Sequence, residues 1–232
     1  MATETFLAMT AAEIHCCGSL PPKIGWMACH FSPEAPGLTD LPTTLPPDSL
    51  LILDDSTPFS GHSESMILAQ LRECVEKLNC QAVLLDFQRP CCPESLALAK
   101  HLSGAFPCPV AVSEAYAKDL ACPVFLSPLP HHIALKDHLA PWQGRQLWLE
   151  LALDGEIITV TESGATIAPL PPGRTFTAAH KDQTLHCHYR TEVSETKAKF
   201  TLWRTRDDLD TLLKEAESTE IATTIGLYQE LR

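Results

Sequence analysis

Positive charge, glycine and long apolar runs are all scarce in this chain. Its 232 residues include 17 Lys and Arg against 29 Asp and Glu, which gives a net charge of −12. A surface of this sign is repelled by phosphate backbones and by anionic lipid, so neither nucleic acid nor a membrane is an expected partner. No stretch reaches the roughly 18 uninterrupted apolar residues that span a bilayer, and residues 1–15 lack the basic segment that opens a secretory signal. These absences predict a cytoplasmic protein.

The sequence also lacks the usual signatures of cofactor and metal sites. No glycine-rich loop follows a predicted strand, so no cofactor is expected. Clusters of His and Cys occur at 15–17 and 186–188, but no Cys-x-x-Cys is present and the spacing is not that of zinc ligands, so no metal is predicted. Several of the ten cysteines lie within or beside apolar segments, which indicates that most of the ten are reduced core residues rather than disulfides.

Short β-rich segments alternate with amphipathic helices, a pattern typical of parallel βα units. Helices are predicted at 66–78 from apolar spacing, from Pro93 to about residue 105, and after Thr205 and Asp208, which form a variant of the capping box. The predicted strands are residues 23–31, 50–54, 82–87, 110–113, 124–126, 146–153, 199–204 and 224–231.

Eight strands with at least three crossover helices favour a (β/α)₈ TIM-barrel-like fold, small or reduced, over an open doubly wound sheet. The length suits a single domain over residues 1–232. The Asp-Gly pair at 154–155 and the turn-like "VSET" predict extra antiparallel hairpin strands at about 154–200. The proline-rich residues 32–48 and the segment 168–175 are predicted to be loops.

The segment "QAVLLDFQRP", residues 81–90, is an apolar strand that ends in polar groups. Side chains alternate along a strand, so Leu84, Asp86 and Gln88 share one face. The opposite face carries Val83, Leu85 and Phe87. If the first face looks into a barrel, Asp86 and Gln88 lie at its carboxyl-terminal mouth, where such barrels place their chemistry.

This segment resembles the signature strand of glycoside hydrolase family 18, the chitinase-like barrels, whose pattern is D-G-x-D-x-D-x-E. Over Gln81 to Gln88 the sequence reads Q-A-V-L-L-D-F-Q, so only the last Asp of the pattern is kept, as Asp86. The last third of the chain is similar to the spore-cortex-lytic branch of that family. Its Y-x-D, V-W-F-E-D-x-x-S and G-x-x-x-W-x-L segments are matched in order by "HYRTE", "FTLWRTRDDLDTLLKEA" and "TIGLYQEL".

The resemblance implies a substrate-assisted reaction in which the motif Glu protonates the glycosidic oxygen and the preceding Asp orients the substrate acetamide. Gln88 occupies the acid position here, and a carboxamide has no proton to give, a loss that typically costs about 10²–10⁴-fold. Leu84 replaces another acid, "FLSPLP" lacks the family's active-site Tyr, and the final Trp has become Tyr228. These departures indicate a changed or lost reaction.

Other acids end predicted strands and are candidates for the same mouth. Glu114 could act as a replacement acid, or could cap a short helix that begins near Ala115. Asp54 and Asp55 could share a proton or bind a cation, or could form a strand-end turn with their own backbone.

Two further groups are candidates for sugar binding. Glu150 and Trp148, two residues earlier on the same face, resemble a sugar subsite in which an aromatic ring stacks on the sugar and a carboxylate accepts its hydrogen bonds. An equal alternative is that Glu150 is a buried carboxylate with a structural role. Tyr228 would offer a second stacking face. Gln229 and Glu230 fall at the same mouth if the barrel closes, and the sequence leaves open which of them points inward.

These patterns together predict a family 18-like protein that binds an amino-sugar glycan, with catalysis weakened or absent. Asp86 would hold the acetamide, and Gln88 would donate and accept hydrogen bonds at the former acid position. One alternative is an active glycosidase that uses Glu114 or Glu150 as its acid. Another is a non-catalytic scaffold, for example a coat-type protein associated with a spore.

Overall fold

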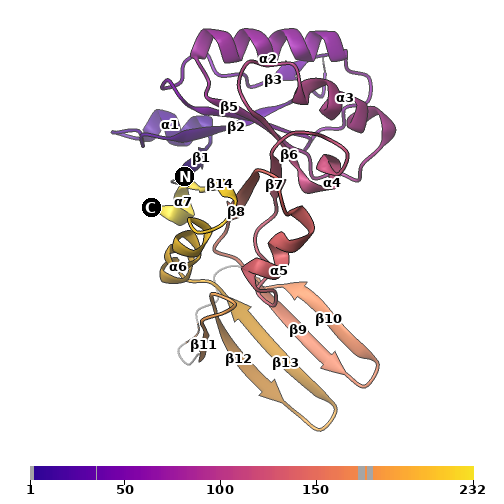
Figure 1. Ribbon diagram of the computed structural model, residues 1–232, viewed down its shortest axis with the longest axis vertical. Helices are drawn as coiled ribbons and strands as arrows, with labels where there is room; N and C mark the ends of the chain where they lie inside the picture. Colours follow the sequence, from indigo (N-terminus) through magenta and orange to yellow (C-terminus); the bar gives the residue numbers. More distant parts are fainter. Residues whose placement is uncertain (1–2, 35, 172–175, 177–179) are drawn as a thin grey trace.

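The computed structural model describes residues 3–34, 36–171, 176 and 180–232. In this part of the chain, eight parallel strands close into a barrel, because β1 pairs with both β14 and β2. Figure 1 shows the barrel with its helices outside and a second sheet below it. The barrel strands are β1 (Glu4–Met9), β2 (Ile24–Phe31), β4 (Leu50–Asp54), β5 (Ala82–Asp86), β6 (Val110–Ser113), β7 (Val124–Leu126), β8 (Leu147–Leu151) and β14 (Ile221–Leu227). This closure confirms the barrel and excludes the open sheet.

The predicted strands match the barrel with two corrections. Residues 199–204 lie in the second sheet, and the missing barrel strand is β1, which falls outside every predicted segment. Its sequence, ETFLAM, has no clear alternation, and Glu, Ala and Met are not typical strand formers, so its state depends on pairing with distant strands. The last predicted strand starts earlier than expected and gives way to a helical turn, α7 (Tyr228–Leu231).

The three predicted helices are present, and the others are short. α2 (Glu64–Leu78) buries Ile67, Leu71 and Val75, α3 (Pro93–Ser103) begins at its proline, and α6 (Arg206–Ala216) follows a capping box made by Thr205 and Asp208. The shorter helices are α1 (Ala11–Cys16), α4 (Glu114–Ala117), α5 (Leu135–Leu139), a 3₁₀ turn (Ala140–Trp142) and α7. None of the helices in the described residues is long and apolar enough to cross a membrane.

Apolar side chains pack on both sides of the barrel wall. Along β5, Val83, Leu85 and Phe87 point outward to the helices, whereas Leu84 points into the barrel, as the alternation predicts. At the amino-terminal end of the barrel, the side chain of Gln81 donates to Glu4 at 2.7 Å and accepts from Lys23. Gln81 and Glu4 also border a cavity of about 310 Å³ at this end.

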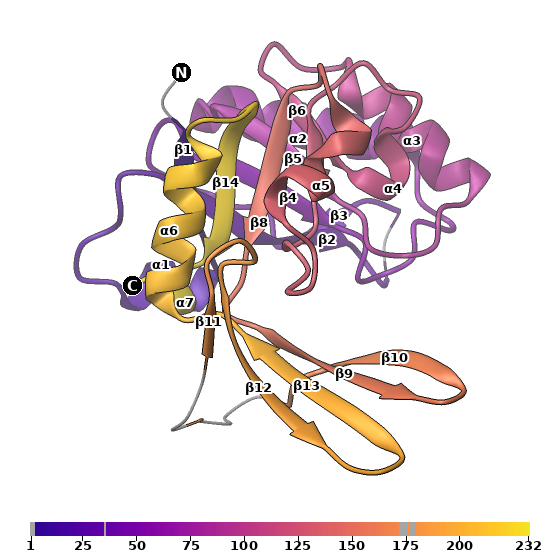
Figure 2. The ribbon, with the colours of Figure 1, turned by 60° about the horizontal axis from the view of Figure 1, so that its bottom comes forward.

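The residues between β8 and α6 form a second, antiparallel sheet that projects from the barrel, as Figure 2 shows. Its described strands are β9 (Gly155–Thr161), β10 (Gly164–Pro169), β11 (His180–Asp182), β12 (Cys187–Val193) and β13 (Lys197–Trp203). The turn at "VSET" between β12 and β13 is confirmed. The hairpin predicted at 154–155 is wrong, because β8 and β9 belong to different sheets and β9 pairs instead with β10 and β13.

The two predicted loops differ in outcome. Residues 32–48 are irregular except for β3 (Leu38–Thr39), which pairs antiparallel with β2. In the segment 168–175, residues 168–169 end strand β10, whereas residues 172–175 lie outside the described residues.

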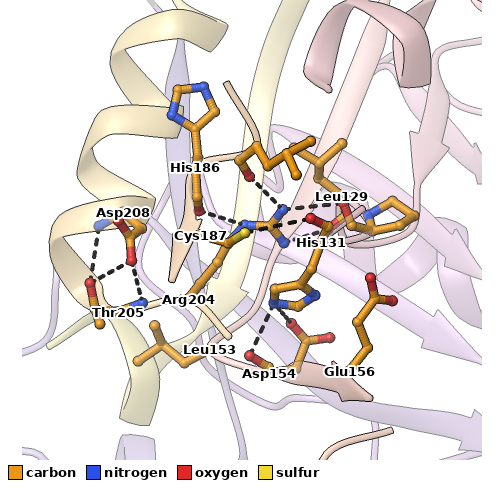
Figure 3. Close-up of polar contacts among 12 residues, drawn as sticks. Leu129, His131, Leu153, Asp154, Glu156, His186, Cys187, Arg204, Thr205 and Asp208 are labelled. Atoms are coloured by element: carbon orange, nitrogen blue, oxygen red, sulfur yellow. Dashed lines mark hydrogen bonds and ion pairs between the residues drawn. The ribbon is translucent and has the colours of Figure 1, made fainter. Parts of the chain in front are cut away.

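Arg204 anchors the second sheet to the barrel (Figure 3). The side chain follows β13 and is only 5% exposed. Its guanidinium donates to four main-chain carbonyls, those of Leu129, Pro130, Leu185 and His186. One cation thus joins the segment after β7 to the segment before β12, and satisfies carbonyls that burial would otherwise leave unpaired.

His131 extends this contact. Its ring is 2% exposed, and Nε2 lies 3.1 Å from the main-chain oxygen of Asp154, which connects β8 to β9. Burial, together with the charge of Arg204, lowers the pKa of His131 to about 3, so the ring is neutral at ordinary pH. The thiol of Cys187 donates to the carbonyl of His131 at 3.5 Å.

Candidate functional site

Two acids from different strands line one cavity at the carboxyl-terminal end of the barrel. Asp86 ends β5 and Glu150 lies near the end of β8, and both border a cavity of about 90 Å³. The rest of its lining is mainly apolar and comes from the other strands: Ala8, Met27, Ile52, Leu84, Phe125, Ile225, Gly226 and Leu227. The carboxylates therefore sit in an environment that disfavours their charged forms.

Asp86 has two polar neighbours in this setting. Its Oδ1 accepts from the side-chain amide of Gln88 at 2.5 Å and lies 3.5 Å from the hydroxyl of Ser113. Burial raises the pKa of Asp86, and the nearby charges of Asp54 and Asp55 add to the rise, although both hydrogen bonds oppose it. Ser113 at the end of β6 was not among the predicted site residues; a hydroxyl at a predicted strand end was the signal that could have found it.

Glu150 is the more strongly perturbed acid. Burial raises its pKa to about 7, and the negative charges of Asp86, Asp154 and Glu230 contribute. Its carboxyl has no hydrogen-bond partner among the described residues. At neutral pH it is thus a mixture of acid and carboxylate, so it can give a proton at the mouth of the barrel.

Asp54 and Asp55 are held by different partners. Asp54 at the end of β4 accepts from the main-chain N–H of Ser56 at 2.8 Å, the turn contact with its own backbone, and lies 2.7 Å from Nδ1 of His30. Asp55 is 5% exposed and accepts the main-chain N–H groups of Gln88 at 2.8 Å and Arg89 at 3.0 Å. Asp55 thereby fixes the segment that carries Gln88.

An open groove runs beside the cavity at the same end of the barrel. It has a volume of about 300 Å³ and is lined by Asp54, Asp55, Ser56, Gln88 and Arg89. Gln88 therefore faces the groove while its amide is bonded to Asp86. The hydrogen bond between Gln88 and Asp86 thus links a residue of the groove to a residue of the cavity.

Glu114 and Trp148 lie away from this cavity. Glu114 is in the first turn of α4, and its carboxylate accepts from the main-chain N–H of Ser127 at 3.4 Å. Trp148 does share the inward face with Glu150, but it is 2% exposed and lies at the amino-terminal end of the barrel, beside Gln81 and Thr223. It is therefore unable to stack on a ligand at the mouth, and the aromatic-plate hypothesis for Trp148 is corrected.

The predicted residues after β14 also point away from the cavity. Leu227 takes the inward position, whereas the hydroxyl of Tyr228 lies 3.4 Å from the thiol of Cys17. The amide of Gln229 donates to Glu13 at 2.8 Å, and the carboxylate of Glu230 accepts from the main-chain N–H of Leu153 at 2.8 Å. Of these three, Glu230 influences the mouth, through its charge on Glu150.

The two histidines of the 186–188 cluster contact separate carboxylates. His186 contacts Glu215 at 2.6 Å, and His188 contacts Asp208 at 2.8 Å. Within the described part of the chain, no three His, Cys, Asp or Glu side chains gather in a way that could hold a metal ion.

No protein-family model and no curated protein sequence matches this chain. Several solved structures are similar to this chain. A catalytic domain of an Ostrinia furnacalis Group II chitinase is similar over 100% of this chain and 91% of its own, with 12% identity and a TM-score of 0.63. The Bacillus cereus spore cortex-lytic enzyme SleL matches over 99% and 71%, with 8% identity and a TM-score of 0.60.

The chain has the fold of the glycoside hydrolase family 18 barrels. A Cycas revoluta chitinase of this family is also similar, over 97% of this chain and 94% of its own, with 9% identity and a TM-score of 0.61. That structure is of a variant with a Gly-to-Trp and a Glu-to-Gln substitution, in complex with (GlcNAc)₄. The resemblance found in the strand around Asp86 is thus confirmed at the level of the fold.

Proposed function

We propose that the protein binds an N-acetylated amino-sugar glycan across the carboxyl-terminal end of its barrel and hydrolyses it weakly or not at all. The observation that carries this proposal is the pair formed by Asp86 and Gln88. The acid that the family 18 motif uses to orient an acetamide borders the cavity, and the motif's acid position holds an amide bonded to it at 2.5 Å.

The cavity suits an acetamide rather than a whole sugar ring. At about 90 Å³ it has room for a small group, and its walls of Met27, Ile52 and Phe125 are apolar like a methyl. The N–H of the acetamide would donate to Asp86. The sugar rings would lie over the adjoining groove, where Asp54, Gln88 and Arg89 supply acceptors and donors.

Gln88 permits binding but not proton transfer. Its carboxamide donates and accepts hydrogen bonds at every ordinary pH, yet cannot protonate a leaving oxygen. A Glu-to-Gln substitution is compatible with a bound tetrasaccharide in the Cycas revoluta chitinase. This supports a glycan-binding role for a barrel whose acid position holds an amide.

A second candidate function is hydrolysis with Glu150 as the acid. Its pKa of about 7 and its place on the same cavity as Asp86 favour it over Glu114, whose carboxylate is engaged with Ser127. A general acid must reach the glycosidic oxygen, so this candidate requires the glycan to enter more deeply.

Calorimetric titration with (GlcNAc)₄, together with an assay of its cleavage, separates these functions. We expect saturable binding by the wild type, loss of binding in the isosteric variant Asp86→Asn, and no loss in Asp210→Asn, an exposed acid on α6. Cleavage that disappears in Glu150→Gln would favour the second candidate. The absence of both binding and cleavage, with chitin and peptidoglycan fragments alike, would reject both and leave the scaffold hypothesis.

A further inference from the structure

A second cavity, of about 450 Å³, lies outside the barrel wall. It is formed by the segment between β4 and α2, the segment between β5 and α3, and the outward side chains Phe31 and Phe87. The volume lies within the range of small-molecule sites in proteins. This pocket shares no residue with the 90 Å³ cavity, although it borders the groove at Asp55 and Arg89.

The inner wall of this pocket is aromatic. Phe31 lies at the centre, with ring centroids 5.6 Å from Phe59, 5.5 Å from His62 and 5.9 Å from Phe87. Tyr116 packs edge-on against Phe87 at 5.5 Å and donates to the carbonyl of Arg89 at 3.0 Å. Phe31, Phe87 and Tyr116 are fully buried and support the wall, whereas Phe59 and His62 are half-buried and can contact an aromatic guest.

Arg89 brings a positive charge to the pocket. Its guanidinium donates to two main-chain carbonyls, of Asp55 at 2.7 Å and of Ser56 at 2.8 Å, and makes no ion pair within 4.0 Å among the described residues. The carboxylate of Asp55, which also lines the pocket, accepts main-chain N–H groups instead. The cation is thus positioned but not neutralised by a contact.

Glu94 brings a negative charge to the same pocket. It lies in the first turn of α3, where its own main-chain N–H holds the pKa of its carboxyl below the usual value. It remains ionised at neutral pH and likewise makes no ion pair among the described residues. Two opposite charges therefore border one aromatic pocket without contacting each other.

The geometry points to a binding site for a small aromatic zwitterion, such as an aromatic amino acid. Its carboxylate would bind the guanidinium of Arg89, and its ammonium would bind the carboxylate of Glu94. Its ring would lie against the half-buried rings of Phe59 and His62. A ligand with only one charge would form one of the two ion pairs and not the other, so it should bind more weakly. The site does not depend on glycan binding at the barrel mouth.

Calorimetric titration of the full chain with L-phenylalanine and L-tryptophan tests this site. We expect saturable binding of at least one of them, and binding at least about tenfold weaker for 3-phenylpropanoate, which lacks the ammonium, and for 2-phenylethylamine, which lacks the carboxylate. L-Leucine, which keeps both charges but has no ring, should also bind more weakly. Equal binding of the singly charged compounds, or no saturable binding of either amino acid, would overturn the proposal.

Variants of Glu94 and Arg89 test whether these two charged side chains bind the ligand. Glu94→Gln keeps both main-chain contacts of the Arg89 guanidinium and should weaken binding by about tenfold, whereas Glu73→Gln on the exposed face of α2 should not. Arg89→Gln should weaken binding more, with Arg72→Gln as its control. Because Arg89 also holds its loop, the decisive variant is Glu94→Gln, whose binding of (GlcNAc)₄ should equal that of the wild type.

Protection of Cys92 gives an independent readout. This exposed thiol lines the pocket, so a bound amino acid should slow its alkylation by iodoacetamide, followed by peptide mass spectrometry. Cys16, which is exposed elsewhere on the chain, should be alkylated at the same rate with and without ligand. Equal protection of both thiols, or of neither, would contradict binding in this pocket.

Discussion

Asp86 on β5 and Glu150 on β8 border the same cavity at the carboxyl-terminal end of the barrel. Each is far from the other in sequence, and each has a raised pKa, partly because the wall around them is apolar. The charge of Asp86 adds to the rise at Glu150. The mouth therefore holds one acid that is bonded to an amide and one that is not bonded to any described residue.

Gln88→Glu is expected to create hydrolysis of chromogenic GlcNAc oligomers. The change places a carboxyl group beside Asp86, and repulsion between the two acids raises the pKa of the pair toward the range that a general acid needs. Since a missing acid costs about 10²–10⁴-fold, the rate should rise at least about tenfold over the wild type. Gln88→Ala is the control and should remain at the wild-type rate. An unchanged rate with glycan binding retained would show that Gln88 is not what limits the reaction.

Glu150→Gln is expected to stabilise the protein at pH 8 and to change little at pH 5. The folded-state pKa of about 7 exceeds the ordinary value of 4.5, so the folded protein binds more protons between these values and loses stability as pH rises through them. The ionised carboxylate costs at most roughly 3 kcal/mol. Thermal melts at both pH values, with Glu192→Gln on the exposed end of β12 as control, should show a gain of several degrees at the higher pH alone. Parallel pH profiles for wild type and Glu150→Gln would contradict the raised pKa.

Arg204→Met is expected to destabilise the chain by about 3 kcal/mol or more, because four main-chain carbonyls lose a buried donor. It should also loosen the second sheet, so that limited proteolysis cuts between residues 155 and 203 before it cuts the barrel. Arg190→Met, on the exposed part of β12, is the matched control and should melt within about 1 kcal/mol of the wild type. Simultaneous cleavage of both parts would argue against Arg204 as the anchor.

Cys17 is expected to react with iodoacetamide faster than Cys16. The hydroxyl of Tyr228 lies 3.4 Å from its sulfur and lowers the pKa of the thiol, and a main-chain hydrogen bond with Ser19 and the charge of Arg232 contribute. Tyr228→Phe removes the hydroxyl and should slow alkylation of Cys17 at pH 7, while Cys16 is unaffected. The rates can be compared by peptide mass spectrometry. If Cys17 is alkylated at the same rate in Tyr228→Phe, the hydroxyl of Tyr228 does not lower the pKa of the Cys17 thiol.

The side on which each strand residue lies could be predicted from the sequence. The alternation in "QAVLLDFQ" placed Leu84 and Asp86 inward and Val83 and Phe87 outward, as found. The same rule placed Trp148 and Glu150 together on the inward face of β8. Periodicity and caps likewise identified α2, α3 and α6, because those signals are local and repeated over several turns.

The height of a side chain along the barrel was decided by the tertiary structure. Trp148 and Glu150 share a face, yet Trp148 borders a cavity at the amino-terminal end and Glu150 borders the cavity at the mouth. Tyr228 was expected at the mouth, but β14 ends at Leu227 and a helical turn directs Tyr228 outward. These positions depend on strand stagger and on where a strand stops, which neighbouring strands fix.

By itself, the sequence determined the βα alternation, the inward place of Asp86 and the replacement of the motif acid by Gln88, because period and residue identity are local properties. The tertiary structure alone decided that β1 closes the barrel between β14 and β2, and that Glu150 shares a cavity with Asp86. It also decided how far the pKa of Glu150 rises. Burial and charge proximity depend on distant segments, so they arise only once the barrel has closed around them.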